Sequence, residues 1–160
     1  KMAVDRLVER EARTAPCRTQ ELPLGQPVDA AGLPRVEGVP EEAYERLAGR
    51  YGHAAHEVLA IAAGSGELAQ PIVPGAPADL LAEAVYAARR EQAVGVGDAL
   101  LRRTRIGLQA ARGVAGDGGA TARRVAAAMG AELGWDDAET ANAAAAFLEE
   151  AAAEGIVTGP

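Results

Sequence analysis

Helix-length segments with an apolar face, separated by glycine and proline, are the feature that most restricts the fold of this chain. Between residues 41 and 51, for example, Tyr44, Leu47 and Tyr51 are spaced at i, i+3 and i+7, the period of an amphipathic helix. Alanine is abundant, aromatic residues make up only 3% of the chain, and no segment alternates like a half-buried strand. The sequence therefore predicts an all-α fold of about six helices, an orthogonal bundle built from helical hairpins.

Capping residues and glycines predict where these helices begin and end. The expected helices span about 41–51, 54–63, 79–93, 98–108 and 122–133, with a last one between Asp136 and Gly155. Asp79 and Asp98 are predicted N-caps, and Asp136 with Glu139 forms a predicted capping box. The glycine-rich segment 113–119 is expected to be a loop. The apolar stripe of the last helix is expected to consist of Ala141, Ala144, Ala145, Leu148 and Ala152.

The first 40 residues differ from the rest. Residues 2–13 show the period of a short amphipathic helix, and the sequence opens directly inside it without a cap, which suggests an excerpt of a longer polypeptide. Residues 14–40 contain five prolines and are predicted to be an extended linker that also wraps part of a surface. The expected division is 1–13, 14–40 and a helical domain at 41–157.

Charge and cysteine content restrict the class of protein further. The formal net charge of -7 repels phosphate backbones, so nucleic acid is excluded as a partner. Cys17 is the only cysteine, which fits a reducing compartment. No window is apolar enough to span a membrane, and the amino terminus lacks the pattern of a signal peptide. These features indicate a soluble, cytoplasmic protein.

Motifs of catalytic or ligand-binding sites are weak in this chain. The run 64–69, GSGELA, matches a dinucleotide fingerprint, but a predicted helix precedes it and Pro71 follows, so its structural context is wrong. His53 and His56 are the only histidines and fit neither zinc-protease motif, so we expect no metal. Ser65 and Cys17 lack a nearby base or elbow motif. The sequence therefore offers no catalytic, cofactor-binding or metal-ligating residue.

Residues 83–108 carry the most unusual chemistry, because carboxylates alternate there with arginines. Two hypotheses follow: Arg102, Arg103 and Arg105 could bind a phosphate through guanidinium forks, or they could pair with carboxylates and brace two helices. The number of nearby carboxylates favours bracing, with a largely buried pair for Arg102 or Arg103. The structural or interface candidates are Glu83, Tyr86, Arg90, Glu91, Asp98, Arg102, Arg103, Thr104 and Arg105.

The same segment resembles a known family. The run DALLRRTR at 98–105, with EAVY at 83–86 and Arg90-Glu91 before it, is similar to the C-terminal helical domain of FAD-dependent, aerobic-type glycerol-3-phosphate dehydrogenases. PCRTQELPL at 16–24 resembles the connector of that family, and GWD at 134–136 its last hairpin. Val96 and Gly97 depart from it, since relatives have a better capping residue before Asp98.

The resemblance implies a function for a longer protein. The parent would oxidise sn-glycerol 3-phosphate to dihydroxyacetone phosphate, reduce FAD and pass electrons to a quinone. FAD and substrate would belong to an N-terminal flavin domain, so this segment would be a non-catalytic cap without its own cofactor. Its partners would be that flavin domain and, in a homodimer, a second copy; the parent would be cytoplasmic or peripheral at the cytoplasmic membrane face. The alternative hypothesis is a free-standing α-helical interaction or regulatory domain.

Overall fold

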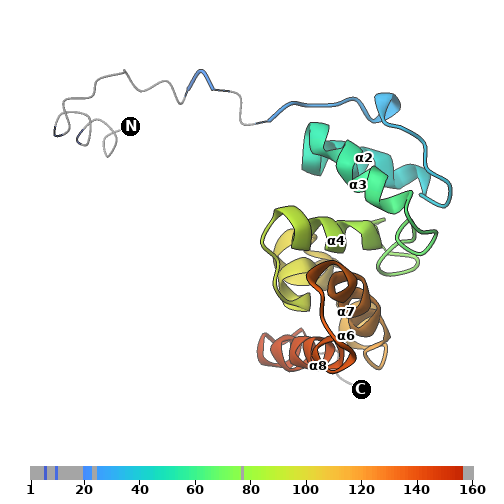
Figure 1. Cartoon of the computed structure of the whole chain (residues 1–160), viewed down its shortest axis with the longest axis vertical. Helices are drawn as coiled ribbons and strands as arrows, with labels where there is room; N and C mark the ends of the chain where they lie inside the picture. Colours follow the sequence, from blue (N-terminus) through green and yellow to red (C-terminus); the bar gives the residue numbers. More distant parts are fainter. Residues whose placement is uncertain (1–5, 7–9, 11–19, 23–24, 77, 157–160) are drawn as a thin grey trace.

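The computed structural model describes residues 6, 10, 20–22, 25–76 and 78–156, and in these residues the fold is all-α, as predicted (Figure 1). The only β-type pairing in this part of the chain is a single bridge between Pro71 and Leu80. The helices are α2 (Glu41–Tyr51), α3 (Ala55–Ala62), α4 (Leu81–Arg90), α5 (Ile106–Gln109), α6 (Ala111–Ala115), α7 (Ala120–Leu133) and α8 (Asp137–Ala153). Two 3-10 turns (Ala30–Gly32 and Gly52–Ala54) and a π-helical segment, η3 (Asp98–Arg103), complete the helical elements.

Helix α4 is the central element of the domain. In Figure 1 it lies between the α2–α3 pair at one end of the long axis and the α7–α8 pair at the other, and it packs against both α3 and α7. Its buried residues divide between two apolar cores: Leu81 and Ala84 belong to one, Val85 and Tyr86 to the other. Because both of its faces are covered, α4 is buried along nearly its whole length from Leu81 to Ala87.

Glycines and caps end the outer helices as the sequence predicts. Gly52 ends α2 with a positive φ of 54°, and a Cβ atom there would lie 2.4 Å from the backbone oxygen of Gln26, so no other residue fits. Gly134 ends α7 in the left-handed conformation. Asp136 and Glu139 form the predicted capping box of α8, with bonds of 2.8 and 2.9 Å. The sequence therefore places both helix ends correctly, although the contact of Gly52 with Gln26 is not local.

The predicted helix over 98–108 is instead two short pieces. The backbone N–H of Thr104 donates to Ala99 O at 2.9 Å, an i→i+5 bond, and the Thr104 hydroxyl donates to the same oxygen at 2.8 Å. The backbone and the side chain of Thr104 thus share one acceptor at the end of the π-helical segment. Arg105 then takes a left-handed φ of 62°, which ends the segment before α5.

Several boundary predictions were wrong. Asp79 is not an N-cap, because its side chain is fully buried in ion pairs and Leu80 occupies the cap position of α4. Asp98 is not an N-cap either: helical structure begins at Val96, and Asp98 accepts bonds from the backbone N–H groups of Val94 and Gly95. Helix α4 ends at Arg90 rather than near residue 93, and the predicted 113–119 loop contains the end of α6.

The apolar stripe predicted for the last helix was also largely wrong. The buried residues of α8 are Ala144, Phe147 and Ala151, whereas Ala141, Ala145 and Ala152 are exposed. Alanines occur on every side of this helix, so their spacing carries little direction. Phe147, the only phenylalanine of the chain, has the largest apolar surface and determines which side faces the core.

The proline-rich segment before α2 contacts the domain where it is described. Leu33 is buried, and Val28, Val36 and Val39 pack against the same apolar core as α2 and α3. The Tyr44 hydroxyl accepts a 2.8 Å bond from the backbone N–H of Val36. The predicted helix at 2–13, except for Arg6 and Arg10, and Cys17 lie outside the described residues. Among the described helices, none is both long and apolar enough to cross a bilayer.

Candidate functional site

Two carboxylates at the start of α4 are the most deeply buried charged groups of the described chain. Asp79 is 0% exposed and Glu83 is 1% exposed. They meet Arg46, Arg50 and Tyr51 from the second half of α2, and we call these five residues the buried carboxylate cluster. The two arginines and the two carboxylates have the same spacing: Arg46 and Arg50 are four residues apart on α2, and so are Asp79 and Glu83. The cluster therefore joins α2 to the central helix.

Asp79 is bonded through one of its two oxygens. Its Oδ1 atom accepts bonds from Arg46 Nε at 3.1 Å and Arg46 Nη2 at 2.8 Å, and it lies 2.9 Å from Arg50 Nη1. Its Oδ2 atom is buried without a hydrogen-bond partner. Such an oxygen is expensive to bury, so the ion pairs of Oδ1 must offset part of its lost hydration.

Glu83 is bonded on both oxygens. Its Oε2 atom accepts from Arg50 Nη1 in a short contact and from the Tyr51 hydroxyl at 3.0 Å. Its Oε1 atom accepts from the backbone N–H of Leu80 at 2.7 Å, which satisfies one of the free donors at the start of α4. Leu80 has no side-chain oxygen to return the bond, so this is half of a capping box.

Burial and neighbouring charges shift the pKa values of the cluster. Burial raises the pKa of the Glu83 carboxyl to about 7; Arg50 opposes this rise, and the nearby Asp79 carboxylate adds to it. Burial lowers the pKa of Arg50, but Glu83 and Asp79 more than offset that effect and raise it above its ordinary value. Burial and Glu83 raise the pKa of the Tyr51 phenol, so that group stays protonated and donates its hydrogen bond.

The cluster also reaches the segment after η3. Arg50 Nη2 donates to the backbone oxygen of Thr104 at 3.2 Å, and Arg46 Nη2 lies 3.5 Å from Gln109 Oε1. Thr104 is itself buried, and its hydroxyl accepts from the backbone N–H of Ile106 at 3.4 Å. The two arginines therefore connect three separate stretches of chain: α2, the start of α4, and residues 104–109.

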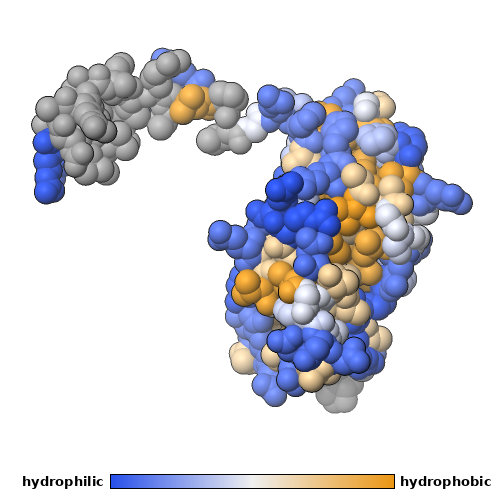
Figure 2. All heavy atoms as spheres, in the orientation of Figure 1, coloured by the Kyte–Doolittle hydropathy of each residue, from blue (hydrophilic) through white to orange (hydrophobic). Residues whose placement is uncertain are grey.

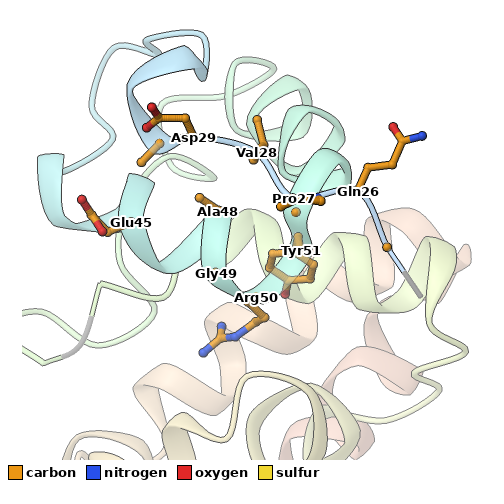
Figure 3. A pocket seen from close by; sticks show the side chains of 12 residues that line it. Gln26, Pro27, Val28, Asp29, Glu45, Ala48, Gly49, Arg50 and Tyr51 are labelled. Atoms are coloured by element: carbon orange, nitrogen blue, oxygen red, sulfur yellow. The ribbon is translucent and has the colours of Figure 1, made fainter. Parts of the chain in front are cut away.

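A cavity of about 710 Å³ lies between the last turns of α2 and residues 25–30, and Arg50 and Tyr51 of the cluster are among the residues that line it. Figure 3 shows Asp29 and Glu45 at one end of this cavity, and the Arg50 side chain extending away from the segment 26–29. The guanidinium of Arg50 is thus directed to Glu83, Asp79 and Thr104. The polar groups of the cluster contact one another, and this arrangement is suited to holding elements together.

The sequence-predicted candidates fall into separate places. Glu83 is in the buried carboxylate cluster, and the Tyr86 ring packs edge-on against Tyr51 with centroids 5.2 Å apart. Thr104 supplies its carbonyl to Arg50 and its hydroxyl to the π-helical segment. Arg90 leaves this region altogether and pairs with Glu57 of α3 at 2.7 Å.

The bracing pairs predicted for the arginines of 102–105 are confirmed in part. Arg102 pairs with Asp98 at 3.4 Å and with Glu150 of α8 at 2.7 Å. Arg103 donates two bonds to the backbone oxygen of Glu91, while its Nε is 3.8 Å from Glu91 Oε2, too far for a hydrogen bond. Both arginine side chains are at least 38% exposed, so the largely buried pair predicted for one of them is wrong.

Sequence reasoning missed the partners of Glu83. It expected arginines from the same stretch, whereas the structure supplies Arg50 from more than 30 residues earlier. Asp79 was interpreted as a cap, and Arg46 was not considered. A signal was present, because Arg46 and Arg50 match Asp79 and Glu83 in their i,i+4 spacing, which would align two charges on each of two facing helices.

The two histidines lie side by side at the turn between α2 and α3. The His53 and His56 rings lie 4.9 Å apart, and His56 Nδ1 is 3.0 Å from the backbone oxygen of His53. Within the part of the chain that the structure describes, no three histidine, cysteine, aspartate or glutamate side chains gather closely enough to hold a metal ion.

Fold and site together define an all-α domain organised on one central helix, with an internal network of ion pairs as its polar centre. Residues 17–140 match the family model described as the C-terminal domain of alpha-glycerophosphate oxidase, and the chain belongs to that family. The family resemblance inferred from residues 83–105 is thereby confirmed.

Relatives with curated names agree with this family. The chain is 36% identical over 120 residues to glycerol-3-phosphate dehydrogenase 2 of Mycobacterium tuberculosis (strain ATCC 25618 / H37Rv), which covers 74% of this chain and 20% of the relative. It is 42% identical over 101 residues to glycerol-3-phosphate dehydrogenase 1 of the same strain, which covers 62% of this chain and 18% of that relative. The chain thus spans about a fifth of the length of the relatives it matches. No solved structure matches it.

Proposed function

We propose that this chain is the C-terminal helical domain of an FAD-dependent glycerol-3-phosphate dehydrogenase. The parent enzyme oxidises sn-glycerol 3-phosphate to dihydroxyacetone phosphate, reduces FAD in an N-terminal flavin domain and passes the electrons to a quinone. In this proposal residues 1–13 end the last helix of the flavin domain, residues 14–40 are the connector, and residues 41–157 are the helical domain. The proposal places the parent in the cytoplasm.

The comparisons that support this proposal cover most of the chain. The family match extends over residues 17–140, and both mycobacterial relatives carry the name glycerol-3-phosphate dehydrogenase. Because the chain spans about a fifth of each relative, the flavin, the substrate and the hydride transfer are assigned to the remaining part of such a polypeptide.

We assign the helical domain a supporting, non-catalytic role. The observation that carries this assignment is the geometry of the buried carboxylate cluster. Asp79 and Glu83 are at most 1% exposed, and their bonds go to Arg46, Arg50 and Tyr51 of the same domain. A general acid or base must lie within hydrogen-bond reach of a substrate, and carboxylates enclosed in this way are better suited to fixing α2 against α4.

The test compares the parent polypeptide with this chain alone. The parent, purified intact, should be yellow with a flavin absorbance band and should reduce a dye when glycerol 3-phosphate is added. The chain of residues 1–160, purified alone and checked for helicity by circular dichroism, should be colourless and inactive. Flavin bound by the separate chain, or an intact parent with no flavin and no glycerol-3-phosphate-dependent dye reduction, would refute the proposal.

A further inference from the structure

The surface formed by the turn after α4 and by residues 103–108 carries exposed arginines and exposed large apolar side chains. We call it the arginine face and define it by Gln92, Val94, Arg103, Arg105 and Leu108. Val94 is 74% exposed and Leu108 is 57% exposed. Among the described residues, the one other exposed large apolar side chain is Leu22, which is far from this segment in the sequence. In Figure 2, hydrophobic atoms are visible at the surface over the part of the chain that Figure 1 colours yellow.

Hydrogen bonds hold the parts of this face together. Arg103 Nε and Nη2 donate to the backbone oxygen of Glu91 at 3.2 and 2.8 Å, which fixes η3 beside the turn that carries Gln92 and Val94. The Asp98 carboxylate accepts from the backbone N–H of Val94 at 3.0 Å. The backbone N–H of Leu108 donates to Arg105 O at 3.1 Å, so Arg105 and Leu108 are one turn apart.

The backbone of this face is strained at two positions. Gln92 and Arg105 have φ values of 57° and 62°, and they are the two described non-glycine residues with positive φ. Elsewhere the chain places glycine at such positions, as at Gly52 and Gly134. Side chains retained in a conformation that favours glycine are concentrated at functional and binding segments. Both of these side chains are exposed.

The buried carboxylate cluster supports the arginine face from behind. Arg50 binds the carbonyl of Thr104, directly before Arg105, and Arg46 lies against Gln109, directly after Leu108. Both ends of the 105–108 segment are therefore connected to α2. A preorganised segment loses less conformational entropy when a partner binds it, so a rigid support of this kind favours docking.

From these observations we infer that the arginine face is the surface on which the domain docks against the flavin-bearing part of its own polypeptide, at an acidic patch with an apolar centre. The inference rests on the proposed function, because the aligned part of this chain covers only about a fifth of each relative. Val94 and Leu108 supply the apolar contact. Arg105, which has no ion pair or side-chain hydrogen bond within the described residues, supplies the unneutralised charge.

A second apolar surface is less suited to this partner. The groove between α3, α4 and α7 has a volume of about 440 Å³ and is visible as hydrophobic atoms between α3 and α7 in Figure 2. Arg89, the arginine that lines it, is already neutralised within the domain, because it pairs with Glu132 at 2.7 Å. The groove thus has no free positive charge for an acidic partner, and it provides a matched control.

The test measures thiol accessibility in the intact parent polypeptide. Leu108→Cys is compared with Ala131→Cys, an exposed position on the groove, and each variant is labelled with a maleimide in the native and the urea-unfolded protein. In the native parent, labelling of Leu108→Cys should be slower than that of Ala131→Cys by about tenfold or more, since the core of an interface excludes water. The two rates should be equal after unfolding. A second variant, Arg105→Glu, should restore rapid labelling of Leu108→Cys without changing that of Ala131→Cys.

The possible results distinguish a failure of the docking proposal from a failure of the proposed function. A yellow, active parent in which Leu108→Cys labels as fast as Ala131→Cys would overturn the docking surface and leave the proposed function intact. Protection of Leu108→Cys that disappears on dilution would assign the face to a second copy and also overturn it. A parent without flavin or glycerol-3-phosphate-dependent activity would refute the proposed function. Flavin absorbance and dye reduction measure this independently of the thiol labelling.

Discussion

Two groups of arginines in this domain differ in how much water surrounds them. Arg50 is 24% exposed and binds Asp79 and Glu83, which are 0% and 1% exposed. Arg102 is 48% exposed and binds Asp98 and Glu150, which are 27% and 30% exposed. Water screens the second group, whereas removing a partner from the first leaves a buried charge uncompensated. Similar ion pairs should therefore differ severalfold in their effect on stability.

The largest effect is expected for Arg50→Ala. This change removes the guanidinium from both Glu83 and Asp79 and should lower the free energy of unfolding by about 3 to 5 kcal/mol at pH 8. Urea denaturation of the separate chain, followed by circular dichroism, measures the change. A loss below about 1 kcal/mol would mean that the cluster behaves like a surface ion pair.

The next effect concerns pH and Glu83. Its folded-state pKa of about 7 lies above the ordinary 4.5, so its contribution to stability is complete below about pH 4.5 and is lost as pH rises through 7. The rise corresponds to about 3 kcal/mol at most. Denaturation at pH 5 and pH 8 should show this loss in the original chain, and Glu83→Gln should reduce it. If the free energy of unfolding depended on pH in the same way in both proteins, Glu83 would not be the group with the raised pKa.

A smaller effect is expected for Tyr51→Phe. The change removes the hydroxyl that donates to Glu83 Oε2 at 3.0 Å, while Arg50 still binds that oxygen. The free energy of unfolding should fall by about 1 to 2 kcal/mol, with the ring contact to Tyr86 retained. Tyr44→Phe, which removes a hydroxyl bonded to the backbone of Val36, is the matched control. Tyr44→Phe should leave unchanged the pH dependence of the free energy of unfolding that Glu83 causes.

The smallest effects are expected for Arg102→Ala and Arg103→Ala. Each should lower the free energy of unfolding by less than Tyr51→Phe does, because the side chains and their carboxylate partners are partly hydrated. The effect of Arg102→Ala should decrease further in high salt. A loss as large as that of Arg50→Ala for either variant would support the buried bracing pair that the sequence suggested.

The fold was largely predictable, and the residues where prediction failed have a common cause. Gly134 and the capping box of Asp136 and Glu139 act through neighbouring backbone, and Gly52 ends α2 through its own positive φ, so local sequence contains the information needed to place these helix ends. Asp79 and Glu83 depend on Arg46 and Arg50 of another helix, and only the packing of α2 on α4 brings them together. Phe147 shows the same limit, because a helix rich in alanine is oriented by one large side chain and the space that receives it. The site could be predicted only as far as its members interact locally.

The most direct test of the account is a pair of double-mutant cycles measured by urea denaturation at pH 8. The coupling energy between Arg50 and Glu83, from Arg50→Met, Glu83→Gln and the double variant, should be about 2 to 3 kcal/mol. The coupling energy between Arg102 and Glu150, from Arg102→Met, Glu150→Gln and their combination, should be severalfold smaller. Equal coupling energies for the two pairs would contradict the claim that the buried carboxylate cluster, and not the exposed arginines, holds this domain together.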